Sequence, residues 1–327
     1  MKAVVITQPG GPEVLSVMDV PEPTWGPEDL LVRVKATALN RADVIQRLGR
    51  YPMPGPKPAY DVPGLEFAGE VVGVGERVAG FAEGDRVMGL LAGGGYAEMV
   101  ATHHRLVVKV PDNLSWHEAG SIPEVFITAH DAFLQCNLVA GERVLVHAAG
   151  SGVGIAGIQI AKAMGASLVV STAGSEEKLA AARELGMDVG VNYRTQDFAE
   201  EIERVTGGLG VDVILDVIAA DYWDRNMRAL AIKGRMIIVG SLSGSKVEVN
   251  LGVLGQKRAQ VRGTGLRVRP TEEKGQATHA FAKSVLPHLA SGRIKTVIDR
   301  VYPFAEAAEA HRYMESNANF GKIVLVP

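Results

Sequence analysis

The pattern of hydrophobic and polar positions changes once along the chain, near Pro111. Before it, short runs of aliphatic and β-branched residues, such as LLVRVKA at residues 30–36, alternate with clusters of glycine and proline. This alternation is typical of strands joined by turns. We therefore expect a partly open β-barrel over residues 1–124. One short helix is predicted within it, at about residues 42–48, beginning after Asn40.

From about Glu142 the pattern becomes a regular succession of strands and helices. The run RVLVHAA at residues 143–149 is followed by VGIAGIQIAKAM at residues 153–164, an apolar helical pattern that ends at a glycine. Repeated units of this kind require right-handed crossovers and a parallel sheet with helices on both faces. We expect a Rossmann domain over residues 125–266, whose sixth strand is AQVRGT at residues 259–264.

The last part of the chain leaves this rhythm. Residues 267–327 are expected to return to the first domain, with one helix over residues 275–291 and a final strand at residues 321–327. A chain of 327 residues is long enough for two such domains.

Composition and charge narrow the class of protein. The chain is 47% hydrophobic and 22% charged, with a formal net charge of −3, so nothing indicates nucleic acid or an anionic membrane surface as a partner. No window approaches the run of about 18 apolar residues that spans a bilayer, and the first residues do not resemble a signal peptide. The single cysteine, Cys136, excludes a disulfide framework and any multi-cysteine metal site. We expect a cytoplasmic protein.

The motif GVGIAG at residues 152–157 matches GxGxxG and lies between a predicted strand and a predicted helix. In that context the glycines permit the tight turn, the approach of the backbone to a pyrophosphate and the packing of helix on strand. The helix N-terminus supplies amide donors for the phosphates. The residues expected at the pyrophosphate are Gly150, Ser151, Gly152, Val153 and Gly154.

The end of the second predicted strand indicates which dinucleotide binds. NAD-specific domains place an acidic residue there for the ribose 2′-hydroxyl, whereas this strand ends with Gly174 and Ser175. Ser175, Lys178 one helical turn later, and Tyr193 after the third strand are candidates for a 2′-phosphate, which favours NADPH. Two glutamates after Ser175 oppose this interpretation. The alternative is that Ser175 only caps its helix and Lys178 is solvated.

Several segments carry a family resemblance over essentially the whole chain. They are ALNRADVIQRLGRYP at residues 38–52, VPGLEFAGEVVGVG at 62–75, GERVLVHAAGSGVGIAGIQIAK at 141–162 and AHRYMESNANFGKIVL at 310–325. The sequence resembles the zinc-independent quinone oxidoreductase (zeta-crystallin-like) branch of the medium-chain dehydrogenase/reductase superfamily. It departs from the branch pattern at Ser151, where a glycine is usual. The resemblance implies a GroES-like catalytic domain formed by residues 1–124 and 267–327.

The zinc ligands of the superfamily's alcohol dehydrogenases are replaced. Asn40 stands in the place of the cysteine, and Leu65 in the place of the histidine. Because catalytic zinc needs three suitable protein ligands, no metal site is expected. His103 and His104 are adjacent in a predicted strand, so we expect their side chains on opposite faces, not as a metal pair.

The resemblance also implies a set of catalytic residues. It places Asn40, Asp43 and Tyr51 around a cleft beside the nicotinamide, where Asn40 would donate its amide and Tyr51 its phenol to the acceptor. The alternatives are that Asn40 and Asp43 cap the helix that follows them and that Tyr51 is an ordinary loop residue. Further cofactor contacts that the resemblance implies are Thr128, Ile218, Gly240, Ser241, Leu242 and Asn317.

These observations predict a zinc-independent, NADPH-dependent reductase that transfers hydride to a quinone or a related enone. Two alternatives remain open, namely a reductase of enoyl thioesters and an NADPH-binding protein with little turnover. The resemblance further implies a homodimer formed through the edge strand at residues 259–264.

Overall fold

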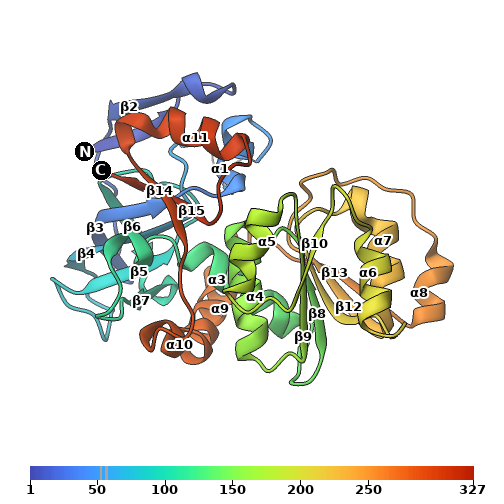
Figure 1. Ribbon diagram of the computed structural model, residues 1–327. Coiled ribbons are helices and arrows are strands. Elements are labelled where there is room, and N and C mark those ends of the chain that lie inside the picture. The colour runs from blue at the N-terminus through green and yellow to red at the C-terminus, as the bar shows by residue number, and fades with distance from the viewer. Residues whose placement is uncertain (52–53, 56–57) are drawn as a thin grey trace. The chain divides into compact units, whose positions relative to one another are not determined.

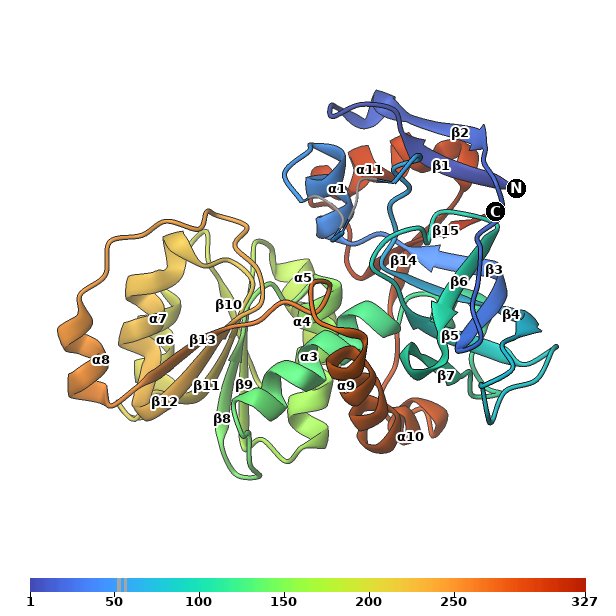
Figure 2. The same cartoon turned by 180° about the vertical axis from the view of Figure 1, so that it is seen from behind.

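The computed structural model describes residues 1–51, 54–55 and 58–327. The chain divides into two compact units (Figures 1 and 2). Unit 1 is formed by Met1–Ile127 together with Leu266–Pro327, and unit 2 by Thr128–Gly265. The family of folds predicted from the sequence is confirmed, since unit 1 is built mainly of strands and unit 2 of alternating strands and helices.

Unit 1 is organised around a curved seven-stranded sheet. Along β3 the side chains of Leu30, Val32 and Val34 are buried at every second position, as expected for a strand with one face on a hydrophobic core. The strands follow the order β14 (Ile298–Pro303), β15 (Lys322–Val326), β3 (Asp29–Ala38), β4 (Glu66–Val74), β5 (Arg86–Leu90) and β7 (Val107–Lys109), and β6 (Met99–His103) also pairs with β3. A separate antiparallel ribbon is formed by β1 (Lys2–Ile6) and β2 (Leu15–Asp19).

The helices of unit 1 are mostly short. They are α1 (Arg41–Arg47), α2 (Trp116–Ala119), α9 (Thr271–Ser284), α10 (Leu286–Ala290) and α11 (Ala307–Glu315), with 3₁₀ turns η1 (Pro12–Val14), η2 (His104–Leu106) and η4 (Phe304–Glu306). The single helix predicted over residues 275–291 is wrong. It is two helices separated at Val285, because Pro287 has no amide hydrogen and cannot donate the helical hydrogen bond to the carbonyl of Lys283.

The expectation that the side chains of His103 and His104 lie on opposite faces is also wrong. β6 ends at His103 and η2 begins at His104, so the backbone no longer alternates between faces at this point. The two imidazole rings stack with centroids 4.7 Å apart.

Unit 2 is a doubly wound parallel sheet. The strand order is β10 (Val189–Asn192), β9 (Leu168–Ala173), β8 (Arg143–Val146), β11 (Val211–Asp216), β12 (Leu230–Ile238) and β13 (Gln260–Gly263). The helices are α4 (Gly152–Ala163), α5 (Glu176–Arg183), α6 (Phe198–Val205), α7 (Trp223–Ala229) and α8 (Leu251–Lys257), with the 3₁₀ turn η3 (Ala220–Tyr222) before α7. Helix α3 (Pro123–Gln135) runs from unit 1 into unit 2. The direction of winding reverses between β8 and β11, where such sheets bind their ligands.

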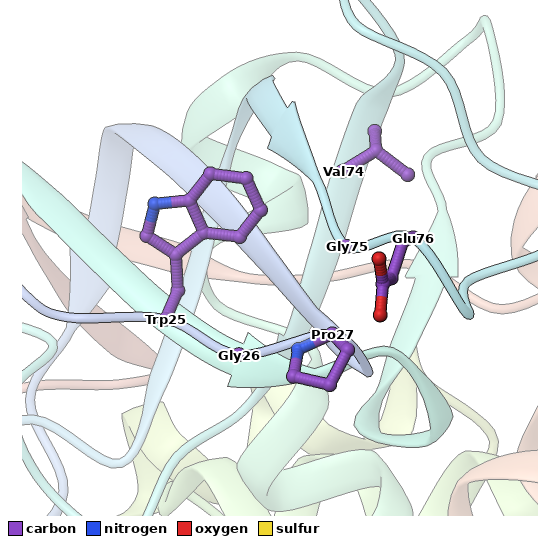
Figure 3. Close-up of a pocket in the computed structure, with 6 residues that line it drawn as sticks. All are labelled: Trp25, Gly26, Pro27, Val74, Gly75 and Glu76. Carbon is purple, nitrogen blue, oxygen red and sulfur yellow. The ribbon is translucent and has the colours of Figure 1, made fainter.

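Unit 1 also has an open hollow at its surface. In unit 1, Trp25, Gly26, Pro27, Val74, Gly75 and Glu76 line an open hollow of about 330 Å³ at the end of β4 (Figure 3). It contains none of the residues predicted for catalysis.

Within the described part of the chain, no helix is both long enough and apolar enough to cross a membrane.

Candidate active site

The glycine motif forms the turn between β8 and α4. Ser151 caps α4, because its hydroxyl accepts a hydrogen bond of 2.9 Å from the amide of Gly154. A Cβ atom at Gly154 would lie 2.1 Å from the carbonyl oxygen of Ala148, so only glycine fits there. The amides of Gly152 and Val153 lie in the first turn of the helix, where no intrahelical acceptor exists. These donors and the helix dipole fit a pyrophosphate.

The residues expected near a 2′-phosphate gather after β9. The hydroxyl of Ser175 accepts a hydrogen bond of 3.4 Å from the amide of Lys178, so its role as helix cap is confirmed. A Cβ atom at Gly174 would lie 2.6 Å from the hydroxyl oxygen of Tyr193, which places that phenol close to the Gly174 backbone. The backbone amide of Glu177, followed by the Ser175 hydroxyl, lowers the pKa of the Glu177 carboxyl by hydrogen bonding, so Ser175 donates to Glu177 in this structure.

The other residues expected at the cofactor fall into two groups. In unit 2, Ile218 follows β11, and Gly240, Ser241 and Leu242 follow β12. These loops lie side by side, since the amide of Leu242 donates to the carbonyl of Val217 at 3.2 Å. Thr128 is the first residue of unit 2, in α3, and is half-buried. Asn317 belongs to unit 1, where its side-chain oxygen accepts a hydrogen bond of 2.6 Å from Arg41.

Asn40 lies at the centre of a buried polar cluster in unit 1. Its side-chain nitrogen donates to Glu66 Oε1 at 2.9 Å and to the carbonyl of Ala38 at 3.3 Å. Its oxygen accepts a hydrogen bond of 2.7 Å from the ammonium of Lys322. Both amide hydrogens are therefore used within the protein. The expectation that Asn40 donates to the acceptor conflicts with this geometry, and Asn40 instead holds Lys322 and Glu66.

Lys322 is the cation of this cluster. Its ammonium donates to the carbonyl of Leu39, to Asn40 Oδ1 and to Glu66 Oε1, all within 2.8 Å. Glu66 is completely buried and the side chain of Lys322 is 6% exposed.

The described residues contain no group of three His, Cys, Asp or Glu side chains that could hold a metal ion. Where the zinc-dependent members of the superfamily place a ligand, Asn40 here binds an ammonium.

Asp43 is completely buried beside this cluster. Its carboxylate accepts hydrogen bonds from the amide of Asn40 at 2.8 Å, the amide of Gly64 at 3.2 Å and the hydroxyl of Tyr96 at 3.0 Å. Burial raises the pKa of Asp43 to about 6. These contacts agree with the structural alternative for Asp43. Asp43 caps α1 and ties it to the segment around Gly64.

Tyr51 is anchored by an arginine that the sequence analysis did not single out. The guanidinium of Arg267 lies 4.6 Å from the centroid of the Tyr51 ring and donates to the Tyr51 carbonyl at 3.0 Å. Arg267 also donates to the carbonyl of Ala92 at 2.7 Å and to Gln46 Oε1 at 2.6 Å. Tyr51 therefore differs from an ordinary loop residue. Pro52, which ends the segment that carries the family resemblance, lies outside the described residues.

Glu124, at the start of α3, is a second residue that the sequence analysis missed. Its amide donates to Glu66 Oε2 at 2.9 Å, which brings its carboxyl group close to that of Glu66. Burial, followed by the charge of Glu66, raises the pKa of Glu124 to about 8. The only signal in the sequence is an acidic residue within the apolar run IPEVFI, which by itself does not separate a buried side chain from an exposed one.

We expect Glu124 to make the protein less stable as the pH rises. In the unfolded chain this carboxyl ionises near 4.5, but in the folded protein only near 8, so the folded state binds more protons between these values. The free energy of unfolding therefore falls from about pH 4.5 to about pH 8. Tm is measured from pH 5 to pH 9. The Tm of Glu124→Gln should rise relative to that of the wild type as the pH rises, whereas the Tm of the exposed control Glu13→Gln should keep a constant difference from it. A constant difference between Glu124→Gln and wild type would contradict the assignment.

Two family models match the chain. Residues 26–112 match the alcohol dehydrogenase GroES-like domain, and residues 152–283 match the zinc-binding dehydrogenase model. The name of the second model refers to a metal, while the ammonium of Lys322 occupies the oxygen cluster at Asn40 and Glu66 in this chain.

Curated relatives match over the full length. A quinone oxidoreductase of Lama guanicoe is 34% identical and covers 100% of this chain and 97% of its own. A quinone oxidoreductase of Pseudomonas aeruginosa is 33% identical and covers 97% of both chains.

Solved structures agree with these relatives. A quinone oxidoreductase of Pseudomonas syringae is 32% identical with a TM-score of 0.88, covering 100% of this chain and 99% of its own. A mycobacterial protein in complex with NADPH is 30% identical with a TM-score of 0.89 and full coverage of both chains. The JamJ enoyl reductase is 27% identical with a TM-score of 0.88, covering 99% and 98%. With this agreement along its whole length, the chain belongs to the quinone oxidoreductase family of the medium-chain dehydrogenase/reductase superfamily.

Proposed function

We propose that the protein is an NADPH-dependent reductase that delivers hydride to a quinone or a related enone without a metal ion. The observation that carries the proposal is the buried Lys322, whose ammonium is held by Asn40 and Glu66 where a zinc-dependent relative needs a metal ligand. In the zinc-dependent alcohol dehydrogenases of this superfamily, the metal acts as a Lewis acid that stabilises the alkoxide. A quinone that accepts hydride becomes a stabilised phenolate and requires only one or two hydrogen-bond donors.

We assign the two halves of the reaction to the two units. Thr128–Gly265 binds the cofactor through the turn after β8 and the loops after β9, β11 and β12. When bound, the dihydronicotinamide supplies the hydride. The other unit binds the acceptor at Tyr51, whose phenol donates a hydrogen bond to the acceptor oxygen. The guanidinium of Arg267, 4.6 Å from the ring, orients Tyr51 and adds positive charge near the developing phenolate.

Turnover tests this function directly. NADPH consumption with ortho-quinones and para-quinones should exceed consumption with an enoyl thioester of similar size. The reverse order would establish the enoyl reductase, a function that the similarity to the JamJ structure supports. Bound NADPH without oxidation by any acceptor would establish a binding protein.

Tyr51→Phe should lower kcat/KM for a small quinone by roughly tenfold, because one hydrogen bond that forms to the developing charge is lost. NADPH affinity should remain within twofold of the wild type, since Tyr51 belongs to the acceptor-binding unit. Tyr60→Phe, at an exposed tyrosine of the same unit, is the matched control. Equal kcat/KM for both variants would show that Tyr51 does not bind the acceptor.

NADPH is proposed over NADH because no acid directly follows Ala173, the last residue of β9. Ser175 and Lys178 stand instead at the start of α5, and the phenol of Tyr193 lies close to Gly174. Lys178→Ala should raise KM for NADPH by roughly tenfold to a hundredfold and leave KM for NADH unchanged, because a charge-assisted contact with the 2′-phosphate is worth about 1.5–3 kcal/mol. Arg204→Ala, at an exposed cation on α6, is the control. Equal effects of Lys178→Ala on both cofactors would contradict the assignment.

We further propose a cytoplasmic homodimer. The edge strand β13 presents unpaired backbone groups, and the neighbouring helix α8 contains no buried residue although Leu251 is apolar. A second copy of β13 would extend the sheet and cover these groups. Light scattering after size exclusion tests the dimer.

The single buried thiol of Cys136 supports a reducing compartment.

A further inference from the structure

A chain of hydrogen bonds crosses the interior of unit 2 through His147, which is completely buried just after β8. Its Nε2 lies 2.8 Å from Asn226 Oδ1, and its Nδ1 lies 3.1 Å from the hydroxyl of Thr172. Asn226 donates from Nδ2 to Asp216 Oδ2 at 3.0 Å. The hydroxyl of Thr172 accepts from the amide of Ala148 at 3.3 Å. Three strands and α7 are thereby connected by side chains alone.

The protons in this chain have one consistent arrangement. The amide of Asn226 donates to the carboxylate of Asp216, so its oxygen faces His147 and requires a donor. Nε2 of His147 must carry the hydrogen, and Nδ1 must accept one from Thr172. Rings of Phe198 and Tyr222 cover the imidazole with centroids within 4.9 Å. Burial lowers the pKa of His147, in agreement with a neutral ring.

Both ends of this chain of hydrogen bonds lie at backbone segments with strained dihedral angles. Ala148 has φ of 61° and Ala219 has φ of 71°, a region in which alanine is strained. At the far end the Asp216 carboxylate accepts from the amide of Ile218 at 2.7 Å and from the amide of Ala219 at 3.2 Å. At the near end the amide of Ala148 donates to Thr172. The side chains thus hold two strained turns that local propensity does not favour.

These turns have a particular place in the sheet. One follows β8 and the other follows β11, and these neighbouring strands flank the point at which the winding reverses. The carbonyl of Ala148 lies against Gly154 of the phosphate-binding turn, where a Cβ atom would approach it to 2.1 Å. A shift of Ala148 therefore moves the first turn of α4. The conformations of both walls of the cofactor site depend on the same histidine.

We propose that His147 is a positioning residue of the cofactor site, which as the Nε2–H tautomer links the turn after β8 to the turn after β11 through Thr172, Asn226 and Asp216. It does not contact the cofactor. It holds the two turns that carry the cofactor-binding backbone, through the amides of Ala148, Ile218 and Ala219, so its loss weakens cofactor binding beyond any loss of stability. The proposal rests on the dinucleotide site of the proposed function.

Four variants test the linkage. His147→Leu removes both hydrogen bonds, His147→Gln keeps a donor at the place of Nε2, and His147→Asn keeps an acceptor at the place of Nδ1. Phe198→Leu is the matched control, because it removes a ring that packs on His147 and leaves every hydrogen bond of the chain in place. Tm, the dissociation constant for NADPH and amide hydrogen exchange of the cofactor-free protein are measured for each.

His147→Leu should raise the dissociation constant roughly tenfold, which is 1.4 kcal/mol, whereas Phe198→Leu at a similar loss of Tm should stay within twofold. Amide exchange should accelerate at Ala148, Ile218 and Ala219 in His147→Leu. In His147→Gln it should accelerate only at Ala148, and in His147→Asn only at Ile218 and Ala219. Equal weakening of NADPH binding by Phe198→Leu, or a uniform rise in exchange over unit 2, would overturn the proposal.

If His147→Leu does not fold, Thr172→Val supplies the same test, because it removes the hydroxyl from a residue of the same shape. It should accelerate exchange at Ala148 and leave Ile218 and Ala219 unchanged, and unchanged exchange at Ala148 would overturn the linkage. A wild-type protein that binds neither NADPH nor NADH would end the proposed function, while the exchange pattern would still decide the role of His147.

Discussion

Replacing Lys322 by methionine should lower the free energy of unfolding by about 3–5 kcal/mol, because the carboxylate of Glu66 then remains buried without its cation. Methionine fills a similar volume, so packing is largely kept. A domain of this size loses about 2–4 °C of Tm per kcal/mol, which gives a fall in Tm of about 10 °C. Denaturant titration and thermal unfolding measure both quantities.

The matched control is Lys2→Met. Lys2 forms an ion pair with Asp19 at 2.7 Å, close to the 2.8 Å of Lys322 and Glu66, but its side chains are 53% and 78% exposed instead of 6% and 0%. An exposed pair of this kind contributes little, so Tm should hardly change. The double variant Lys322→Met with Glu66→Gln should recover most of the loss, since the buried charge is gone. If Lys322→Met costs no more than Lys2→Met, the cluster does not stabilise the fold.

Gly154→Ala should nearly abolish cofactor binding. Its Cβ would lie 2.1 Å from the carbonyl oxygen of Ala148, so either the turn after β8 or the start of α4 must move. Because both elements carry the amides that we propose for the pyrophosphate, we expect the dissociation constant for NADPH to rise roughly a hundredfold, or about 2.7 kcal/mol. Isothermal titration measures this directly.

Gly255→Ala is the control for Gly154→Ala. Gly255 lies in α8 of the same unit, and nothing lies within 4 Å of the Cβ that alanine would add. Since alanine favours helix over glycine by about 1 kcal/mol, this variant should bind NADPH as the wild type does and unfold at an equal or slightly higher temperature. NADPH binding by Gly154→Ala at wild-type affinity would show that the turn tolerates a side chain there.

The fold was predictable because the sequence patterns that determine it lie within short segments of the chain. The strands and helices of unit 2 follow from the periodicity of hydrophobic residues, and the turn before α4 follows from the spacing of its glycines. The break between α9 and α10 was also readable, from Pro287, but the apolar pattern on both sides of it favoured one helix.

The polar cluster was not predictable in the same way. Asn40, Glu66 and Lys322 meet because β15 pairs with β3 at Val324 and Ala38, and β3 pairs with β4 at Ala36 and Ala68. The first register joins segments that are hundreds of residues apart and the second joins segments a few tens apart, and no local pattern reports either. A lysine before the apolar run IVLV was a weak signal. The sequence indicated that Asn40 replaces a zinc ligand, but not that its amide is already occupied.

The path of the chain through unit 1 has a consequence for biosynthesis. The segment that completes this unit is made after unit 2, and β15 lies between β3 and β14 instead of at the rim of the sheet. Unit 2 is contiguous, so it can fold while the ribosome is still translating. During that time β3 offers an unsatisfied edge, and Glu66 is without its ammonium. The nascent protein therefore passes through a stage with a finished cofactor module beside an incomplete barrel, which is the stage at which a chaperone would matter most.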